Sequence, residues 1–293
     1  MEPIPFDKRA GKIWFNGEAV NWPDVKIHVL NHGLHYASCV FEGERVYEGK
    51  IFKLEEHTER LFHSADRLGF TIPYSQEVLN KSCKDIVKIQ KVNNGYVRPV
   101  VWRGSEMMAI SAQKTKIHVA IATWEWGSYF DPNLKLKGIK LNISKWRRPA
   151  PNTIPWDTKA SGLYMICTLS KHEAEKEGFT DSLMLDYQDN IAEATGANIF
   201  FKNNKNELHT PVPDSFLDGI TRRTIINLAK SKNIKIIERK IRPEELSDFV
   251  GCFLTGTAAE VTPVSQIQKY KFEVCDLIKD LSESYQQLVR KKI

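Results

Sequence analysis

The sequence predicts an α+β protein whose strands are mostly antiparallel. Short runs of alternating apolar residues, typical of strands, are interleaved with segments of helical spacing along the chain. The chain contains neither a G-x-G-x-x-G nor a Walker A sequence, which argues against a Rossmann or P-loop fold. With 293 residues, 42% hydrophobic and 27% charged, the composition is that of a globular protein with a sizeable core. Such a composition excludes a disordered chain.

The first elements are expected to be a hairpin and two helices. Residues 12–15, followed by Asn16-Gly17, predict a strand that enters a tight turn. Apolar residues at helical spacing predict a helix over 54–68, which Gly69 ends. A second helix is expected after Ser75, whose hydroxyl can cap its first turn.

Strands at 95–102 and 117–121 complete the first half. Pro99 lies inside the first of these strands and favours an edge position or a bulge, because proline cannot donate to a neighbour. The composition then changes to a turn-rich, aromatic stretch at 126–133. We therefore predict a small N-terminal domain at 1–126, a linker at 127–137 and a larger C-terminal domain at 138–293.

The second half alternates strands and helices around a loop that prolines interrupt. An alternating strand at 139–143 precedes this loop, at 146–158, and a helix over 162–178 follows it. Next we expect a strand at 182–187, a turn at 188–190 and two short strands that end at Phe201. The remaining expected elements are, in chain order, a helix from near Thr221, a strand at 234–237, a short helix from Pro243, a strand at 252–255 and a C-terminal helix.

Charge and cysteine content restrict the function classes. The net charge of +6 favours small anionic ligands, but the basic residues are spread among 36 acidic ones. A basic nucleic-acid-binding protein would need clustered lysine and arginine with interleaved aromatic residues, which the sequence lacks. The five cysteines show no CxxC and no Cys/His cluster, so we expect no metal site, no disulfides and a reducing, cytoplasmic location. No apolar stretch approaches the ~20 residues that span a bilayer.

Two side chains in the second half could carry chemistry. Lys159 stands at the end of the proline-rich loop among small residues, and a desolvated lysine can form a Schiff base with an aldehyde. A lysine before a helix is, however, more often a solvated surface residue. Glu193 lies on an apolar segment, where a carboxylate needs a partner. That partner is either a structural arginine or the cationic ring nitrogen of a ligand.

Two glycine turns could bind a phosphate. Asp218-Gly219-Ile220-Thr221 leads into a helix N-terminus, whose N–H groups suit an anion. Residues 254–260 form a strand that runs into a Thr/Gly/Ala loop. Each feature alone is common and mostly structural. Together, a reactive lysine, a buried glutamate and two anion-binding turns are the parts that pyridoxal phosphate requires.

These motifs, in this order, resemble the class IV (fold type IV) aminotransferases. The resemblance rests on Lys159-Ala160, on 192–198, on 219–222 and on 255–263. In the first half, 31–36, 40–43 and 95–99 resemble the branched-chain amino acid aminotransferases. The resemblance runs from about residue 13 to residue 263 and implies a two-domain, homodimeric or higher assembly that transaminates Leu, Ile and Val with 2-oxoglutarate.

The resemblance also implies roles for individual residues. Lys159 is the catalytic residue that binds the cofactor covalently and moves the proton, and Glu193 pairs with the ring nitrogen. The other cofactor-binding residues implied are Arg60, Tyr164, Gly219, Ile220, Thr221, Gly256 and Thr257. Substrate-binding residues implied are Tyr36, Phe41, Tyr96, Arg98, Trp126, Tyr129, Thr257 and Ala258. A D-amino acid aminotransferase or an aminodeoxychorismate lyase shares the fold and stays an alternative, and the loop at 103–109 departs from the glycine-rich pattern expected beside the substrate.

Overall fold

The computed structural model describes residues 4–127, 129–130 and 137–291, and the chain forms two compact units. The first unit comprises Met1–Gly127 and Thr158–Gly162, and the second comprises Ser128–Asp157 and Leu163–Ile293. Most of the predicted linker at 127–137 lies outside the described residues. The segment that contains Lys159 thus belongs to the first unit, although the chain has already entered the second before it.

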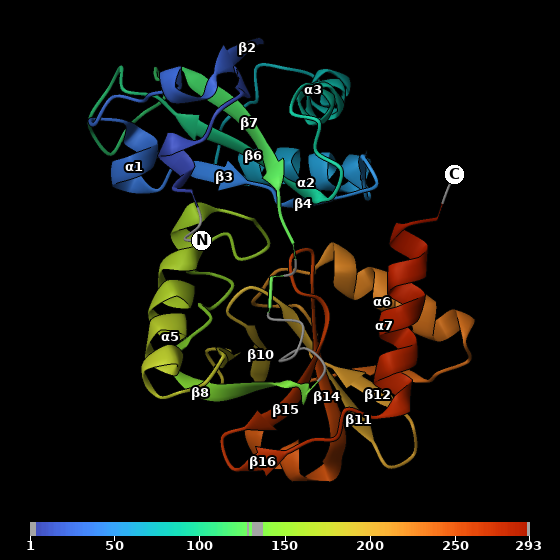
Figure 1. The fold of residues 1–293 in the computed structure, drawn as a ribbon. Coiled ribbons are helices and arrows are strands. Elements are labelled where there is room, and N and C mark those ends of the chain that lie inside the picture. The colour runs from blue at the N-terminus through green and yellow to red at the C-terminus, as the bar shows by residue number, and fades with distance from the viewer. Residues whose placement is uncertain (1–3, 128, 131–136, 292–293) are drawn as a thin grey trace. The chain divides into compact units, whose positions relative to one another are not determined.

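The first unit is built on an antiparallel sheet (Figure 1). Its strands run in the order β2-β1-β7-β6-β4-β5, and β3 also pairs with β6. Their bounds are β1 Lys12–Phe15, β2 Glu18–Asn21, β3 Cys39–Phe41, β4 Glu44–Tyr47, β5 Lys50–Ile51, β6 Gly95–Arg103 and β7 Ile117–Glu125. The predicted hairpin is confirmed: Asn16 and Gly17 form the turn with φ of +50° and +104°.

Helices of the first unit lie against this sheet. α3 (Gln76–Ile89) packs on β1, β6 and β7, and α2 (Leu54–Arg67) packs on α3 and β3 (Figure 1). Both predicted helix ends are confirmed. The Ser75 hydroxyl accepts the Val78 N–H at 3.3 Å, and Gly69 takes a φ of +71° just after α2. The shorter helices are α1 (His32–Tyr36) and the 3-10 turns η1 (Phe6–Lys8) and η2 (Trp22–Asp24).

The prediction that Pro99 marks an edge strand or a bulge is wrong. β6 lies inside the sheet, and Pro99 pairs with Ile121 of β7 in unbroken register. On its other side, β3 ends at Phe41 and β4 begins at Glu44. The Pro99 carbonyl accepts the Glu42 N–H at 2.9 Å in this gap. Since the N and O of one strand residue point to the same side, the N–H that proline lacks would face the interruption between β3 and β4.

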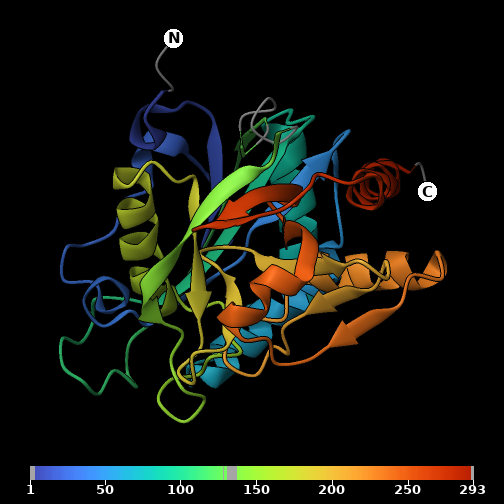
Figure 2. The same cartoon turned by 90° about the horizontal axis from the view of Figure 1, so that it is seen from below.

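The second unit contains a larger mixed sheet. Its order is β10-β9-β8-β15-β14-β11-β12-β13, with β16 on β15 and a further β10–β11 pairing. Figure 2 shows β8 beside β15, although they lie far apart in the sequence, and they pair in parallel. The bounds are β8 Ile139–Arg147, β9 Asp181–Leu185, β10 Ile191–Ala194, β11 Asn198–Asn203, β12 Leu208–Thr210, β13 Ile236–Glu238, β14 Phe249–Gly256, β15 Glu260–Ile267 and β16 Tyr270–Lys271.

Helices of the second unit match the predicted ones in place but not always in type. α5 (Met165–Lys176) follows a 3-10 turn, η3 (Ser161–Tyr164, of which Leu163 and Tyr164 belong to this unit), and α6 (Ile220–Ser231) begins at the Gly219 turn. α6 packs against α7 (Asp276–Val289), beside it in Figure 1. The helix from Pro243 is a 3-10 turn, η4 (Pro243–Asp248). The sequence did not predict β12, β15 or β16.

The sheet of the second unit encloses a continuous apolar core. Leu141, Leu183, Ile199, Leu254 and Val264, from five of its strands, are fully buried in one cluster. These residues hold the strand ends that carry the predicted site residues in fixed register. Among the described residues, no helix is both long and apolar enough to cross a membrane.

Candidate active site

The backbone of Lys159 is held against β3 in the first unit. Its carbonyl accepts the Phe41 N–H at 3.1 Å, and its N–H donates to the Ser64 hydroxyl of α2 at 3.0 Å. Val40 and Ala160 form an isolated antiparallel bridge beside it. The lysine is therefore positioned by main-chain bonds that do not depend on its own side chain.

The Lys159 amine lies in a dense, cationic environment. Its Nζ is 4.9 Å from the centroid of the Phe41 ring. Desolvation, followed by the Arg60 charge, lowers the pKa of this amine to about 8; Arg98 acts in the same direction, and Glu42 and Tyr96 act against it. The neutral fraction near neutral pH is therefore much larger than that of an ordinary lysine, which makes the amine a better nucleophile toward an aldehyde. The surroundings of Lys159 thus fit pyridoxal phosphate.

Each residue of the Phe41-Glu42-Gly43 segment has its own contact near Lys159, Arg60 or Tyr96. The ring of Phe41 lies beneath Lys159 and, at 4.6 Å, beneath the Arg98 guanidinium. Glu42 is fully buried and bonds to α2. A Cβ built on Gly43 would come 1.7 Å from the Tyr96 hydroxyl, so only glycine leaves Tyr96 its place.

Several predicted substrate-binding residues cluster around Tyr96. The Arg98 guanidinium is 5.3 Å from the Tyr96 ring, and Trp126 meets that ring edge-on at 4.8 Å. The Nε of Arg98 is buried without a hydrogen-bond partner among the described residues. Such a buried donor suits an incoming carboxylate. Tyr36 ends α1, stacks on His32 and is 42% exposed.

Two buried carboxyl groups beside Arg60 differ in charge. Glu42 accepts from Arg60 Nε at 2.7 Å and from His57 Nδ1 at 2.7 Å. Although burial alone would raise it, the Arg60 and His57 contacts hold the Glu42 pKa far below its usual value. Burial and the Glu42 charge raise the pKa of Glu44 well above its usual value, and neither Glu44 oxygen has a described hydrogen-bond partner. Glu42 is therefore ionised and Glu44 neutral.

Replacing Glu44 with Gln should make stability less sensitive to alkali. Because the folded-state pKa of Glu44 is raised, the folded chain binds more protons than the unfolded one from about pH 4.5 upward. Stability then falls as pH rises through that window, by up to about 1.4 kcal/mol per pH unit. Urea midpoints of Glu44→Gln and wild type are measured from pH 5 to 9. The midpoint of the variant should rise relative to that of wild type as the pH increases. Parallel pH profiles for the two proteins would contradict a neutral Glu44.

In the second unit, Glu193 is held by two neighbours. It lies on β10, only 8% exposed, with Oε1 at 3.4 Å from the Nε of the buried Arg148. Its Oε2 accepts the Asn198 Nδ2 at 3.2 Å. One of the two partners that the sequence left open, a structural arginine, is thus present. A carboxylate that is fixed in direction by two donors is also suited to a cationic ring nitrogen.

Asn198 links Glu193 to the phosphate-type turn. Its Nδ2 also donates to the Leu217 carbonyl at 2.9 Å, and its Oδ1 accepts the Gly219 N–H at 3.1 Å. A Cβ on Gly219 would lie 2.2 Å from that oxygen, so the turn requires glycine. Gly219 is the N-cap of α6 and has no side chain to cap it, so the N–H groups of the first turn are suited to an anion.

Strand register brings the second glycine turn beside the first. Asn198 pairs with Glu193 on β10 and with Thr255 on β14, and Gly256 follows directly. Ile220 and Thr221 are buried at the start of α6, whereas Gly256, Thr257 and Ala258 remain partly exposed. Tyr164 ends η3, and Tyr129 meets Phe130 edge-on at 4.8 Å.

Sequence reasoning did not identify the residues that support these groups. Glu42, His57, Arg148 and Asn198 were absent from the predicted site. A signal existed for Glu42 and Glu44, since two acids in a run of apolar residues need either a partner or a proton. The sequence carries no such signal for Arg148. Its neighbour Arg147 pairs with Asp189 at the surface, and nothing local distinguishes the two arginines.

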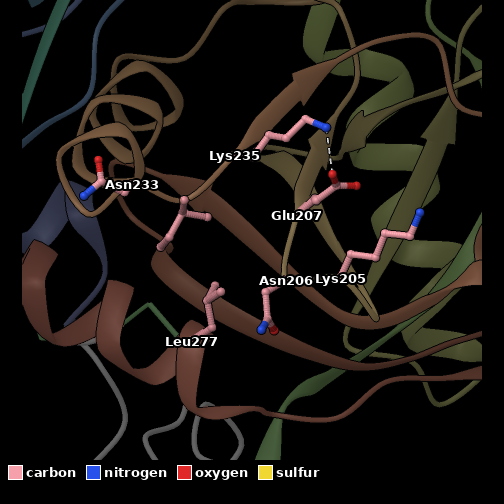
Figure 3. Close-up of a pocket in the computed structure, with 7 residues that line it drawn as sticks. Lys205, Asn206, Glu207, Asn233, Lys235 and Leu277 are labelled. Atoms are coloured by element: carbon pink, nitrogen blue, oxygen red, sulfur yellow. Dashed lines mark hydrogen bonds and ion pairs between the residues drawn. The ribbon is translucent and has the colours of Figure 1, made fainter.

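A surface pocket of the second unit involves none of the predicted site residues (Figure 3). It is lined by Lys205, Asn206, Glu207, Asn233, Ile234, Lys235 and Leu277. Lys235 donates to Glu207 at 2.7 Å, as the dashed line shows, so the charges of this pair are largely balanced. Among the described residues there is no cluster of His, Cys, Asp and Glu that could hold a metal ion.

Comparison with known proteins identifies the class of protein. The family model for class IV amino-transferases matches residues 39–267. This chain belongs to the class IV aminotransferases, so the family predicted from its motifs is confirmed.

Several relatives within the class carry the name of branched-chain enzymes. A probable branched-chain-amino-acid aminotransferase of Rickettsia conorii is 41% identical over 99% of this chain and 100% of its own length. A branched-chain amino acid aminotransferase from T.th., solved with pyridoxamine 5'-phosphate, has a TM-score of 0.93 at 34% identity, covering 97% of this chain and 96% of its own. A second T.th. structure, complexed with N-(5'-phosphopyridoxyl)-L-glutamate, has a TM-score of 0.91 at 33% identity. It covers 96% of this chain and 95% of its own. The predicted fold is confirmed as well.

Proposed function

We propose that this chain is a pyridoxal-phosphate-dependent aminotransferase that moves an amino group between branched-chain L-amino acids and 2-oxoglutarate. The observation that carries the proposal is the partly buried, cationic environment of Lys159, whose amine pKa of about 8 suits bonding to an aldehyde. The relatives crystallised with a pyridoxamine and a phosphopyridoxyl-glutamate ligand support the same cofactor and the same second substrate.

Individual residues of the chain take distinct roles in this proposal. When bound, the cofactor supplies the aldehyde and the electron-withdrawing ring. Lys159 binds that aldehyde and then moves a proton to and from the substrate Cα with its Nζ. Glu193 holds a proton on the ring nitrogen, and Tyr164 donates to the ring oxygen. The phosphate is bound by Arg60 and by the turns at Gly219, Ile220, Thr221, Gly256 and Thr257.

Substrate groups are bound by a separate set. Tyr96 and the amides around Thr257 and Ala258 hold the α-carboxylate, and Arg98 pairs with the second carboxylate of glutamate. The buried Arg98 Nε that has no described partner supports this role. Phe41, Trp126, Tyr36 and Tyr129 supply apolar walls for a branched side chain.

We also propose that the chain works as a cytoplasmic homodimer. Five free thiols favour a reducing compartment. Exposed apolar residues on adjoining segments favour a covering partner: Val29, Leu34 and Ile110 are 68%, 64% and 84% exposed. The segments adjoin because His32 Nε2 bonds to the Ala109 carbonyl at 2.9 Å. Sedimentation equilibrium at twice the 33.7 kDa chain mass would support the dimer, and a monomer mass would refute it.

A half-reaction screen tests the proposed function. The purified chain loaded with pyridoxal phosphate should be yellow, and L-Leu, L-Ile, L-Val and L-Glu should each discharge that colour as the amino group moves to the cofactor. D-Ala should not, because the branched-chain proposal assigns the pocket to L-amino acids. Discharge by D-Ala alone would instead support the D-amino acid aminotransferase, and a colourless protein would refute the cofactor assignment.

A further inference from the structure

The Glu42 carboxylate accepts hydrogen bonds from several residues of the first unit. It lies between β3 and β4 and is fully buried. Arg60 of α2 donates to it twice, from Nε at 2.7 Å and from Nη2 at 2.9 Å. His57, one helical turn earlier, donates from Nδ1 at 2.7 Å, and the Gly43 N–H is 3.2 Å from Oε2. A buried carboxylate with this many donors is ionised and fixed in direction.

The paired geometry constrains Arg60 more than a single bond would. Two parallel N–H bonds set the plane of the guanidinium as well as its distance. His57 is 1% exposed, and burial lowers its pKa, so a neutral imidazole donates to Glu42 without adding charge. The Glu42 main-chain N–H bonds to the Pro99 carbonyl at 2.9 Å. The Glu42 main chain is therefore fixed to β6 by a hydrogen bond.

We propose that Glu42 is a positioning residue, which orients the Arg60 guanidinium toward the cofactor phosphate and balances the positive charge around the Lys159 amine. This inference rests on the proposed function, because that function assigns the phosphate to Arg60. Glu42 is not itself assigned a contact with cofactor or substrate.

Charge around Lys159 supports the second half of the proposal. The groups that act on its amine include Arg60, Arg98, Tyr96, Glu42 and His57, and the two arginines lower its pKa while Glu42 and Tyr96 raise it. Removing the Glu42 charge should therefore lower the amine pKa below about 8. Simple loosening of the structure would do the opposite, since hydration moves a lysine pKa up toward 10.5. The direction of the change separates a charge effect from structural damage.

Glu44 offers a matched control. It is fully buried, stands two positions from Glu42 and is equally a glutamate, but it is neutral and has no described hydrogen-bond partner. The groups that act on it are Glu42, Arg60, Glu55 and Cys83. Glu44→Gln removes no charge near neutral pH, so it should change neither Arg60 nor Lys159.

The experiment compares Glu42→Gln, Glu44→Gln, Arg60→Ala and the double variant Glu42→Gln/Arg60→Ala in the full chain. Cofactor affinity is measured by equilibrium titration with pyridoxal phosphate. The amine pKa is measured, with cofactor removed, from the pH dependence of labelling at Lys159. Glu42→Gln should weaken cofactor binding by about tenfold, the size of one charge-assisted contact, and lower the amine pKa. Glu44→Gln should match wild type in both.

Outcomes for the two assignments are distinguishable. If Arg60→Ala binds cofactor as tightly as wild type, the phosphate assignment of the proposed function fails. If Arg60→Ala weakens binding but Glu42→Gln does not, the positioning role fails alone. The double variant should bind about as weakly as Arg60→Ala, because Glu42 acts through Arg60, and additive losses would contradict this.

A conservative variant keeps the proposal testable if Glu42→Gln does not fold. Glu42→Asp retains the charge but withdraws the carboxylate from Arg60 by one methylene. Cofactor affinity should fall while the Lys159 pKa stays near 8. Unchanged affinity in Glu42→Asp would overturn the positioning role, because the paired bonds to Arg60 at 2.7 and 2.9 Å cannot both persist.

Discussion

Lys159→Ala should abolish transamination while the chain stays folded. Turnover should fall by at least about 10⁴-fold, since the variant loses both the covalent attachment and the group that moves the proton. The fold should survive because the bonds at this position, to Phe41 and Ser64, are made by the main chain and remain with alanine. Removing an amine that lies near Arg60 and Arg98 also relieves like-charge repulsion. Initial rates with L-Leu and 2-oxoglutarate, together with circular dichroism, measure both effects.

Covalent labelling gives an independent test of the same residue. Borohydride reduction of the loaded wild-type chain, followed by peptide mass mapping, should place the cofactor on Lys159. Lys145→Ala is the matched control: Lys145 lies on an exposed part of β8 and pairs with Glu173, so its loss should leave turnover unchanged. Excess pyridoxal phosphate should not restore Lys159→Ala, because the variant lacks chemistry and not affinity. A label on another lysine would refute the assignment.

Much of the fold followed from local sequence signals. Asn16-Gly17, Ser75 and Gly69 act through their own backbone or side-chain chemistry, so their turn and helix ends were predictable from a few neighbouring residues. Pro99 was misjudged because its tolerance depends on where two distant strands, β3 and β4, stop and start. No local pattern carries that information.

The candidate site also contains residues that local motifs predict and residues that only the tertiary structure reveals. Lys159, Glu193 and the glycine turns were predictable because each needs a particular residue type within a short motif. The residues that support the site were not: Glu42 binds Arg60 across 18 positions, and Asn198 accepts the Gly219 N–H across 21. Such partners are selected by tertiary packing, and a single sequence does not reveal which of many arginines or asparagines will be used.

Glu193→Gln should retain the cofactor but lose turnover. Glutamine keeps the shape of the side chain and removes the charge that favours a protonated ring nitrogen. We expect turnover to fall on the order of 10²-fold, as when one preorganised electrostatic partner is removed. The absorption spectrum of the bound cofactor should change with it, because the spectrum reports ring protonation. Single-turnover rates and equilibrium titration separate the chemical step from binding.

The hydrogen-bond network around Glu193 determines how this variant must be controlled. The new amide can face Asn198 Nδ2 with its own NH₂, and Asn198 cannot rotate without losing its bonds to Leu217 and Gly219. Glu207→Gln is the matched control, because Glu207 also accepts from an asparagine and pairs with a cation, Lys235. It should leave turnover and spectrum unchanged. If Glu193→Gln instead keeps wild-type turnover with cofactor bound, the carboxylate has a structural role, and its catalytic role must be withdrawn.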